Sequence, residues 1–168
     1  MMSKLKVELL GMTETGMAKL IRLAAKAAYA HFDYPFDGQV SVTVTDDNGI
    51  RAYNQQYRQV DRATDVLSFP LNDFYRGEPR ENAEEMLDPV TGCVPLGDII
   101  LSAEHIRSQA EEYGHGMARE SAYLTVHSML HLLGYDHVDE SEEKAAMRQT
   151  EEEILSVLGL SRKVDDAD

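Results

Sequence analysis

The 168-residue chain is 43% hydrophobic and 27% charged, a balance that excludes disordered and fibrous proteins and predicts one globular domain. From a mean hydropathy of −0.38 and the lack of a long apolar run, we expect neither a membrane span nor a signal peptide. The single cysteine, Cys93, excludes an internal disulfide, so we expect a cytoplasmic protein.

Charge is distributed unevenly along the chain. The formal net charge of −14 by itself disfavours a nucleic-acid partner. Residues 1–62, however, hold eight Lys and Arg against seven Asp and Glu, so the acidic excess lies in residues 63–168. One half of the chain can therefore present a basic face, and charge neither supports nor excludes RNA as a partner.

The first half of the chain predicts strands that alternate with helices. Residues 5–10 alternate in polarity and are expected to form a strand at or near a sheet edge. The elements expected next are an amphipathic helix over 15–30, a strand over 39–45, a short helix from the turn residues 46–49 to about 57, and a strand over 64–70.

The second half predicts one more strand and three helices. Residues 71–95 are polar and acidic, and we expect a long loop that is mobile or lies over the site. The following elements are an apolar strand over 96–102, helices over 103–113 and 117–133, a helix from Asp139 or Ser141 to about 158, and a disordered acidic tail over 161–168. The pattern predicts an α+β fold, a small mixed four-stranded sheet covered by about five helices.

Three histidines in the segment HSMLHLLGYDH, residues 127–137, are the strongest chemical signal. His127 and His131 are four residues apart, so they project from the same face of the predicted helix. Gly134 is suited to end that helix in a left-handed conformation, which would return His137 towards the other two. The spacing predicts a metal site on this helix and the following turn, with these three histidines as ligands.

Zinc, at one ion per chain, is the metal that three imidazoles indicate first, although nickel, copper and iron also accept them. No fourth protein ligand is near in the sequence, so water is expected in the fourth position, as in catalytic zinc sites. Zinc lowers the pKa of such a water to about 7 and makes it a nucleophile. We therefore expect His127 and His131 to serve catalysis as well as metal binding.

The histidine spacing also matches the metalloprotease pattern H-E-x-x-H-x-x-G-x-x-H, with one difference. Those proteases carry a general-base glutamate after the first histidine, where this chain has Ser128. A serine hydroxyl does not accept a proton near neutral pH as a carboxylate does. Peptide hydrolysis is disfavoured, unless another part of the fold supplies a base.

Three other residues are candidates for the site. Arg58 lies where the short helix ends before the third strand, and its planar donors suit a phosphodiester, so it is a candidate catalytic residue, although an isolated arginine is more often a solvated surface charge. Asp98, in an apolar strand, and Asp136, inside the histidine motif, are candidates to accept the second ring N–H of a metal-binding histidine. Asp98 would equally suit a backbone contact at a strand end, and Asp136 a cap on the turn.

The segments YRQVDRATDVLSFP (57–70), LGDIILS (96–102) and HSMLHLLGYDH resemble, in this order, the motifs of the YbeY family of bacterial endoribonucleases, also called rRNA maturation factors. The resemblance extends from about residue 4 to residue 158. It implies a small mixed sheet with helices and a single metal-dependent endoribonuclease domain over 1–160. It also implies that His127, His131 and His137 are zinc ligands and that Arg58 is the family's functional arginine.

The resemblance further implies an activity and partners. The family cleaves single-stranded RNA, matures the 3′ end of small-subunit ribosomal RNA and takes part in ribosome quality control. We therefore expect ribosomal RNA, the small ribosomal subunit and its proteins as partners, and no membrane. The family usually has glycine at Ser128 and proline at Ala63, so we expect a narrower space beside the metal and a less stiff loop.

Two alternatives remain open from the sequence. The acidic surface also suits a ribosome-assembly factor that binds basic ribosomal proteins and whose metal is mainly structural. A zinc metallopeptidase-like hydrolase is the second alternative.

Overall fold

A four-stranded mixed sheet forms the centre of the computed structural model, which describes residues 3–11, 15–135 and 141–160. The strands lie in the order β1 (Leu5–Gly11), β2 (Gly38–Thr45), β6 (Val94–Ser102) and β3 (Val66–Pro70). The first three are parallel, and β3 pairs with β6 in antiparallel register. The predicted α+β class and the edge position of the first strand are confirmed.

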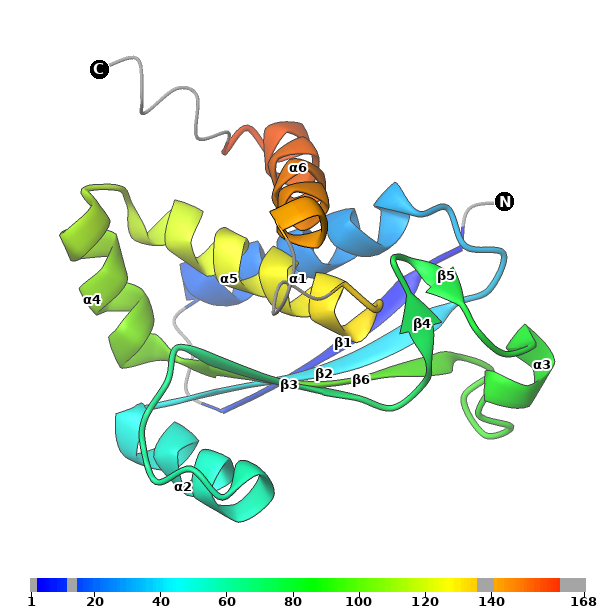
Figure 1. The fold of residues 1–168 in the computed structure, drawn as a ribbon, viewed down its shortest axis with the longest axis horizontal. Coiled ribbons are helices and arrows are strands. Elements are labelled where there is room, and N and C mark those ends of the chain that lie inside the picture. The colour runs from blue at the N-terminus through cyan, green and yellow to red at the C-terminus, as the bar shows by residue number, and fades with distance from the viewer. Residues whose placement is uncertain (1–2, 12–14, 136–140, 161–168) are drawn as a thin grey trace.

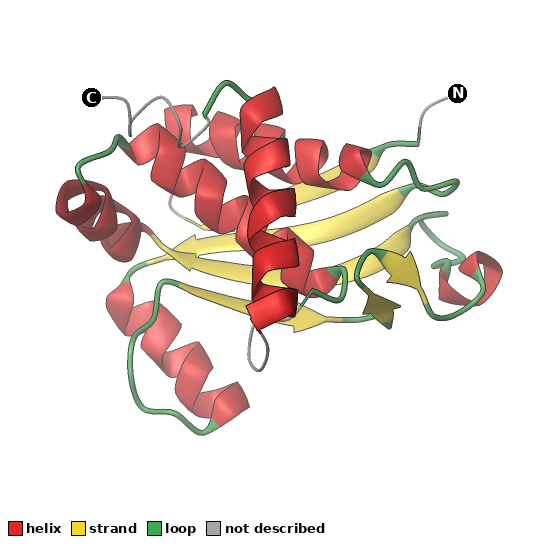
Figure 2. Ribbon diagram, turned by 45° about the horizontal axis from the view of Figure 1, so that its top comes forward, coloured by secondary structure: helices red, strands yellow, loops and turns green. Residues whose placement is uncertain are grey.

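Helices cover both faces of this sheet (Figure 1). One face carries α1 (Thr15–His31) and α5 (Met117–Leu132), with α6 (Ser141–Val157) lying across them. The opposite face carries α2 (Asp47–Arg58), and α4 (Ala103–Tyr113) extends from the end of β6 (Figure 2). None of the described helices is long and apolar enough to cross a membrane.

The alternation of side chains along the strands decides which residues face which helices. The valines of β2 are buried while the residues between them are half-buried. In β6, Ile99 and Leu101 join the main core beneath α5, whereas Ile100 packs with Ile50 and Leu67 on the α2 side. Because both faces of β6 are covered, its sequence is almost continuously apolar.

Residues 71–95 are more ordered than the unbroken loop predicted from their polarity. They contain a hairpin of β4 (Phe74–Tyr75) and β5 (Glu78–Pro79), followed by the short helix α3 (Ala83–Met86). The hairpin packs on the end of α5, where the Gly77 N–H donates to the Leu133 carbonyl at 2.8 Å. This segment therefore supports the turn that follows α5.

Candidate active site

The α5 helix brings His127 and His131 together on its surface. Their Nε2 atoms are 3.1 Å apart, and the two rings are nearly perpendicular, at 87°. Two nitrogens bound to one tetrahedral zinc at about 2.1 Å would be about 3.4 Å apart, so this spacing is close to that of two ligands of one ion. The predicted convergence of the first two histidines is confirmed.

The opposite ring nitrogens of both histidines are held by hydrogen-bond acceptors. Nδ1 of His127 lies 2.5 Å from Glu151 Oε2, and Nδ1 of His131 lies 3.0 Å from the Tyr135 carbonyl oxygen. A carboxylate and a carbonyl accept hydrogen bonds, so both Nδ1 atoms carry a proton, and in the neutral form of each ring Nε2 then presents its lone pair. Two lone pairs facing each other repel, and a bound cation removes that repulsion. The donor set therefore fits a transition metal.

The turn after α5 depends on Gly134. Its φ of +90° lies in the left-handed region, as the sequence predicted. The Gly134 N–H donates to the His131 carbonyl, and the Tyr135 N–H donates to the Leu130 carbonyl, which is the Schellman pattern of helix termination. This reversal is what places the Tyr135 carbonyl against the His131 ring.

The third predicted ligand, His137, lies outside the described residues, as does Asp136. Within the part of the chain that the structure describes, no group of three or more His, Cys, Asp or Glu side chains forms a metal cluster. Two of the three predicted ligands thus have a described position, and the third remains a prediction.

Asp98 faces away from His127 and His131. The prediction that it accepts the second ring N–H of a metal-binding histidine is therefore wrong for these two residues. Asp98 lies on the α2 side of the sheet, in a shallow cavity with Thr43, Tyr57 and Ile100. The physical reason is strand alternation: the neighbouring residue Ile99 faces the α5 layer, so Asp98 must face away. Burial and the nearby charge of Glu8 raise the pKa of Asp98.

Arg58 lies in the same cleft as the two histidines. This open cleft has a volume of about 750 Å³ and is lined by Arg58, Arg62, Asp65, His127 and His131, among others. Nη2 of Arg58 donates to the Ser68 carbonyl of the edge strand β3 at 2.9 Å, and the guanidinium lies 5.3 Å from the centre of the Phe69 ring. Two arginines and one aspartate give the described lining a local positive charge, although the chain as a whole is acidic.

Two site residues were missed by sequence reasoning. Glu151 of α6 is 5% exposed and holds His127, and Tyr123 lies one turn before His127 with the two rings stacked at 5.7 Å. Burial, Glu151 and other nearby carboxylates raise the pKa of Tyr123 to about 12, so its hydroxyl stays protonated at neutral pH. A signal for Glu151 existed, because it falls on the inward stripe of α6 between Met147 and Leu155, where an apolar residue is the rule.

The two departures from the family pattern have local explanations. Ser128 is fully buried, and its hydroxyl donates back to the Leu124 carbonyl at 2.8 Å, so it faces the helix packing rather than the cleft. Ala63 packs against the small core cluster on the α2 side of the sheet. The narrowing expected from Ser128 is therefore absent from the described cleft lining.

The sequence of the chain matches one known protein family. The family model described as Endoribonuclease YbeY matches residues 4–159. A protein named Endoribonuclease YbeY from Agathobacter rectalis is 44% identical over 149 residues, covering 86% of this chain and 89% of the relative. One of the same name from Caldanaerobacter subterraneus is 47% identical over 148 residues, covering 88% and 91%.

One solved structure shares the fold. The solution structure of TM1509 from Thermotoga maritima aligns over 90% of this chain and 91% of that protein, with a TM-score of 0.56 and 23% sequence identity. At this identity the likeness concerns the fold alone.

Proposed function

Since the chain belongs to the YbeY family of endoribonucleases, we propose that it is a zinc-dependent enzyme that cleaves single-stranded RNA, with ribosomal RNA as its natural substrate. Maturation of the 3′ end of small-subunit RNA and ribosome quality control are the roles proposed for it. The observation that carries the metal dependence is the pair of Nε2 atoms at 3.1 Å whose rings are fixed through Nδ1.

The residues of the cleft have different roles in the proposed reaction. Glu151 and the Tyr135 carbonyl orient the two imidazoles, so that both lone pairs point to one place. When bound there, zinc supplies a Lewis acid and a water of lowered pKa. Arg58 and Arg62 line the same cleft and are suited to hold the phosphate whose charge grows during the reaction.

The cleft lining favours a polyanionic substrate over a peptide. It combines two guanidiniums with one carboxylate, Asp65, among its described residues. The position of the protease glutamate is taken by Ser128, which is buried and points into the helix packing. RNA supplies the negative charge that this lining attracts, and a single strand exposes its backbone and bases to the cleft.

Removal and return of the metal tests this proposal. The protein is treated with a chelator, its circular dichroism is recorded, and cleavage of a labelled single-stranded RNA is assayed before and after adding Zn²⁺. We expect a folded apoprotein that loses cleavage and regains it with zinc. Unchanged cleavage by the metal-free protein would contradict the proposal, while unfolding on metal loss would favour an assembly factor with a structural metal.

A further inference from the structure

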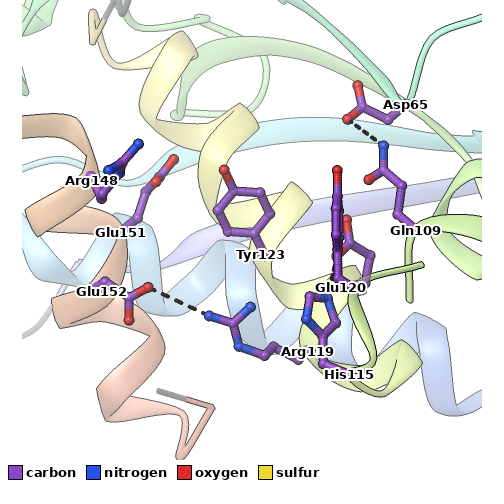
Figure 3. A pocket seen from close by; sticks show the side chains of 10 residues that line it. Asp65, Gln109, His115, Arg119, Glu120, Tyr123, Arg148, Glu151 and Glu152 are labelled. Carbon is purple, nitrogen blue, oxygen red and sulfur yellow. Dashed lines mark hydrogen bonds and ion pairs between the residues drawn. The ribbon is translucent and has the colours of Figure 1, made fainter. Parts of the chain in front are cut away.

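A second cavity lies directly behind His127. It has a volume of about 480 Å³, within the roughly 300–1,000 Å³ range of small-molecule sites. Its walls come from α4, α5 and α6, together with His115 between α4 and α5 and Asp65 just before β3. Figure 3 shows Tyr123 rising between the α6 side chains Arg148 and Glu151 and the pair formed by Asp65 and Gln109. We call it the Tyr123 cavity.

The Tyr123 cavity adjoins the histidine cleft. Asp65 lines both hollows. His127 forms part of the cleft wall, and its ring is backed by Tyr123 and bonded to Glu151, both of which line the cavity. The two hollows therefore lie on either side of the His127 ring, with Asp65 as a shared wall residue.

The charged side chains of the Tyr123 cavity determine which kind of ligand it can bind. Three of its carboxylates have cationic or imidazole partners: Glu120 with His115 at 2.6 Å, Glu152 with Arg119 at 3.6 Å, and Glu151 with His127 at 2.5 Å. The carboxylates still outnumber the arginines, Arg119 and Arg148, by four to two, so a phosphate is repelled. An uncharged group that donates hydrogen bonds is favoured.

Aromatic surface and hydrogen-bonding groups are both present. Tyr113 is 61% exposed at the cavity, and the Tyr123 hydroxyl is directed into it (Figure 3). The carboxylate of Asp65, which accepts from Gln109 Nε2 at 3.3 Å, offers an acceptor for an exocyclic amino group. A flat ring with amino and carbonyl edges matches this combination, and a nucleobase is such a ring.

We propose that the Tyr123 cavity binds one nucleobase of the RNA strand, that of a nucleotide next to the cleaved bond, by stacking on Tyr113 and hydrogen bonding to Asp65 and Gln109. This inference rests on the proposed function, since it names a substrate contact of the same enzyme. It makes Tyr113 a residue that selects and positions the substrate, while the cleft arginines hold the phosphate.

Binding of a fluorescent oligonucleotide tests the inference without cleavage. The probe is a single-stranded 2′-O-methyl RNA that carries 2-aminopurine at each position in turn and is checked for integrity by gel. Stacking quenches 2-aminopurine, so one position should be quenched by the wild type and by Tyr113→Phe, and not by Tyr113→Ala. Because Tyr113 is exposed, both variants should fold, which circular dichroism verifies.

Cleavage of RNA with single abasic nucleotides gives the second readout. One abasic position beside the cleaved bond should lower kcat/KM roughly 5- to 150-fold for the wild type and Tyr113→Phe. Tyr113→Ala should show a comparable loss on intact RNA and little further loss on the abasic RNA. Equal abasic penalties in Tyr113→Ala and wild type, with no Tyr113-dependent quenching, would overturn the inference.

The two readouts separate failure of the inference from failure of the proposed function. Quenching that depends on Tyr113 without any zinc-dependent cleavage would keep the base site and refute the nuclease. Cleavage that is indifferent to Tyr113 would keep the nuclease and refute the base site. Absence of both binding and cleavage would refute both.

Discussion

At the residue scale, the two histidine rings are oriented by one acceptor far along the sequence and one nearby. Glu151 is 24 residues from His127, and only the packing of α6 on α5 brings its carboxylate to Nδ1. The Tyr135 carbonyl is local, but it depends on the left-handed turn at Gly134. The approach of the two histidine rings was therefore predictable from their spacing, whereas the only sequence signal for Glu151 was its place on the inward stripe of α6.

Glu151→Ala should weaken metal binding without removing a ligand. Loss of the partner of a metal-binding histidine typically costs about 10- to 100-fold in affinity, because the ring loses its orientation and its proton position. Competition of zinc between the protein and a chromogenic chelator measures this. Glu151→Gln keeps an acceptor and should lie between the wild type and Glu151→Ala. Equal zinc affinity in all three would show that the hydrogen bond does not orient the ligand.

Arg58→Ala should reduce cleavage and leave the metal in place. Charged hydrogen bonds contribute about 1.5–3 kcal/mol, so kcat/KM on single-stranded RNA should fall roughly 10- to 150-fold. Arg58→Lys keeps the charge but lacks the planar pair of donors, and it should recover only part of the loss. Elemental analysis of the same samples is the control. Full activity of Arg58→Ala would remove this residue from the phosphate site.

Asp98→Asn should stabilise the protein at neutral pH. The folded pKa of Asp98 lies above its ordinary value of 3.8, because of burial and Glu8, so the ionised carboxylate favours the unfolded chain as pH rises through these values. The melting temperature of the variant should exceed that of the wild type at pH 7, and the two should converge below about pH 3.

Metal content is the second readout for this variant. It should equal that of the wild type, since Asp98 lies on the opposite face of the sheet from α5. Lost metal in Asp98→Asn would contradict this placement.

At the element scale, the β4–β5 hairpin and the turn after α5 form one unit. The Arg76 and Gly77 N–H groups donate to the carbonyls of Gly134 and Leu133. A Cβ at Gly134 would lie 2.2 Å from the Phe74 carbonyl oxygen, so the two backbones are in direct contact. The hairpin thereby fixes the carbonyl that orients His131.

Gly134→Ala should therefore damage both stability and metal binding. A left-handed alanine costs about 1–2 kcal/mol by itself, and the clash with the hairpin backbone adds to that cost. The matched control is Gly114→Ala, whose φ of +69° is also left-handed but whose Cβ would meet nothing within 4 Å. Urea unfolding should show the larger loss for Gly134→Ala. Equal losses would mean that the hairpin yields to the added methyl group.

The elements with a clear periodicity were predicted within a few residues, and the hairpin was not. Alternation of valines defined β2, and helical spacing of apolar residues defined α1 and α6. Residues 71–95 have neither pattern, because their hairpin is held by backbone hydrogen bonds to the end of α5, and such contacts leave no trace in polarity. Tertiary contacts, rather than local propensity, order this segment.

At the scale of the whole molecule, the arrangement of charge matters more than its sum. The chain carries −14, yet Arg58 and Arg62 both line the histidine cleft, where Asp65 is the one carboxylate among the described lining residues. The distribution of charge along the sequence indicated this possibility but did not locate it. Asp98 lies on the far face because its neighbour Ile99 faces the α5 layer. The sequence of β6 is almost continuously apolar, so it did not show which face Asp98 would take.

The proposed function requires the histidine site to be both the metal site and the place of RNA cleavage. Elemental analysis of the purified wild type and His131→Ala, paired with a single-stranded RNA cleavage assay on the same samples, tests it most directly. We predict about one zinc per wild-type chain, and loss of zinc and cleavage together in the variant. A variant that loses its metal and still cleaves RNA at the wild-type rate would contradict the account.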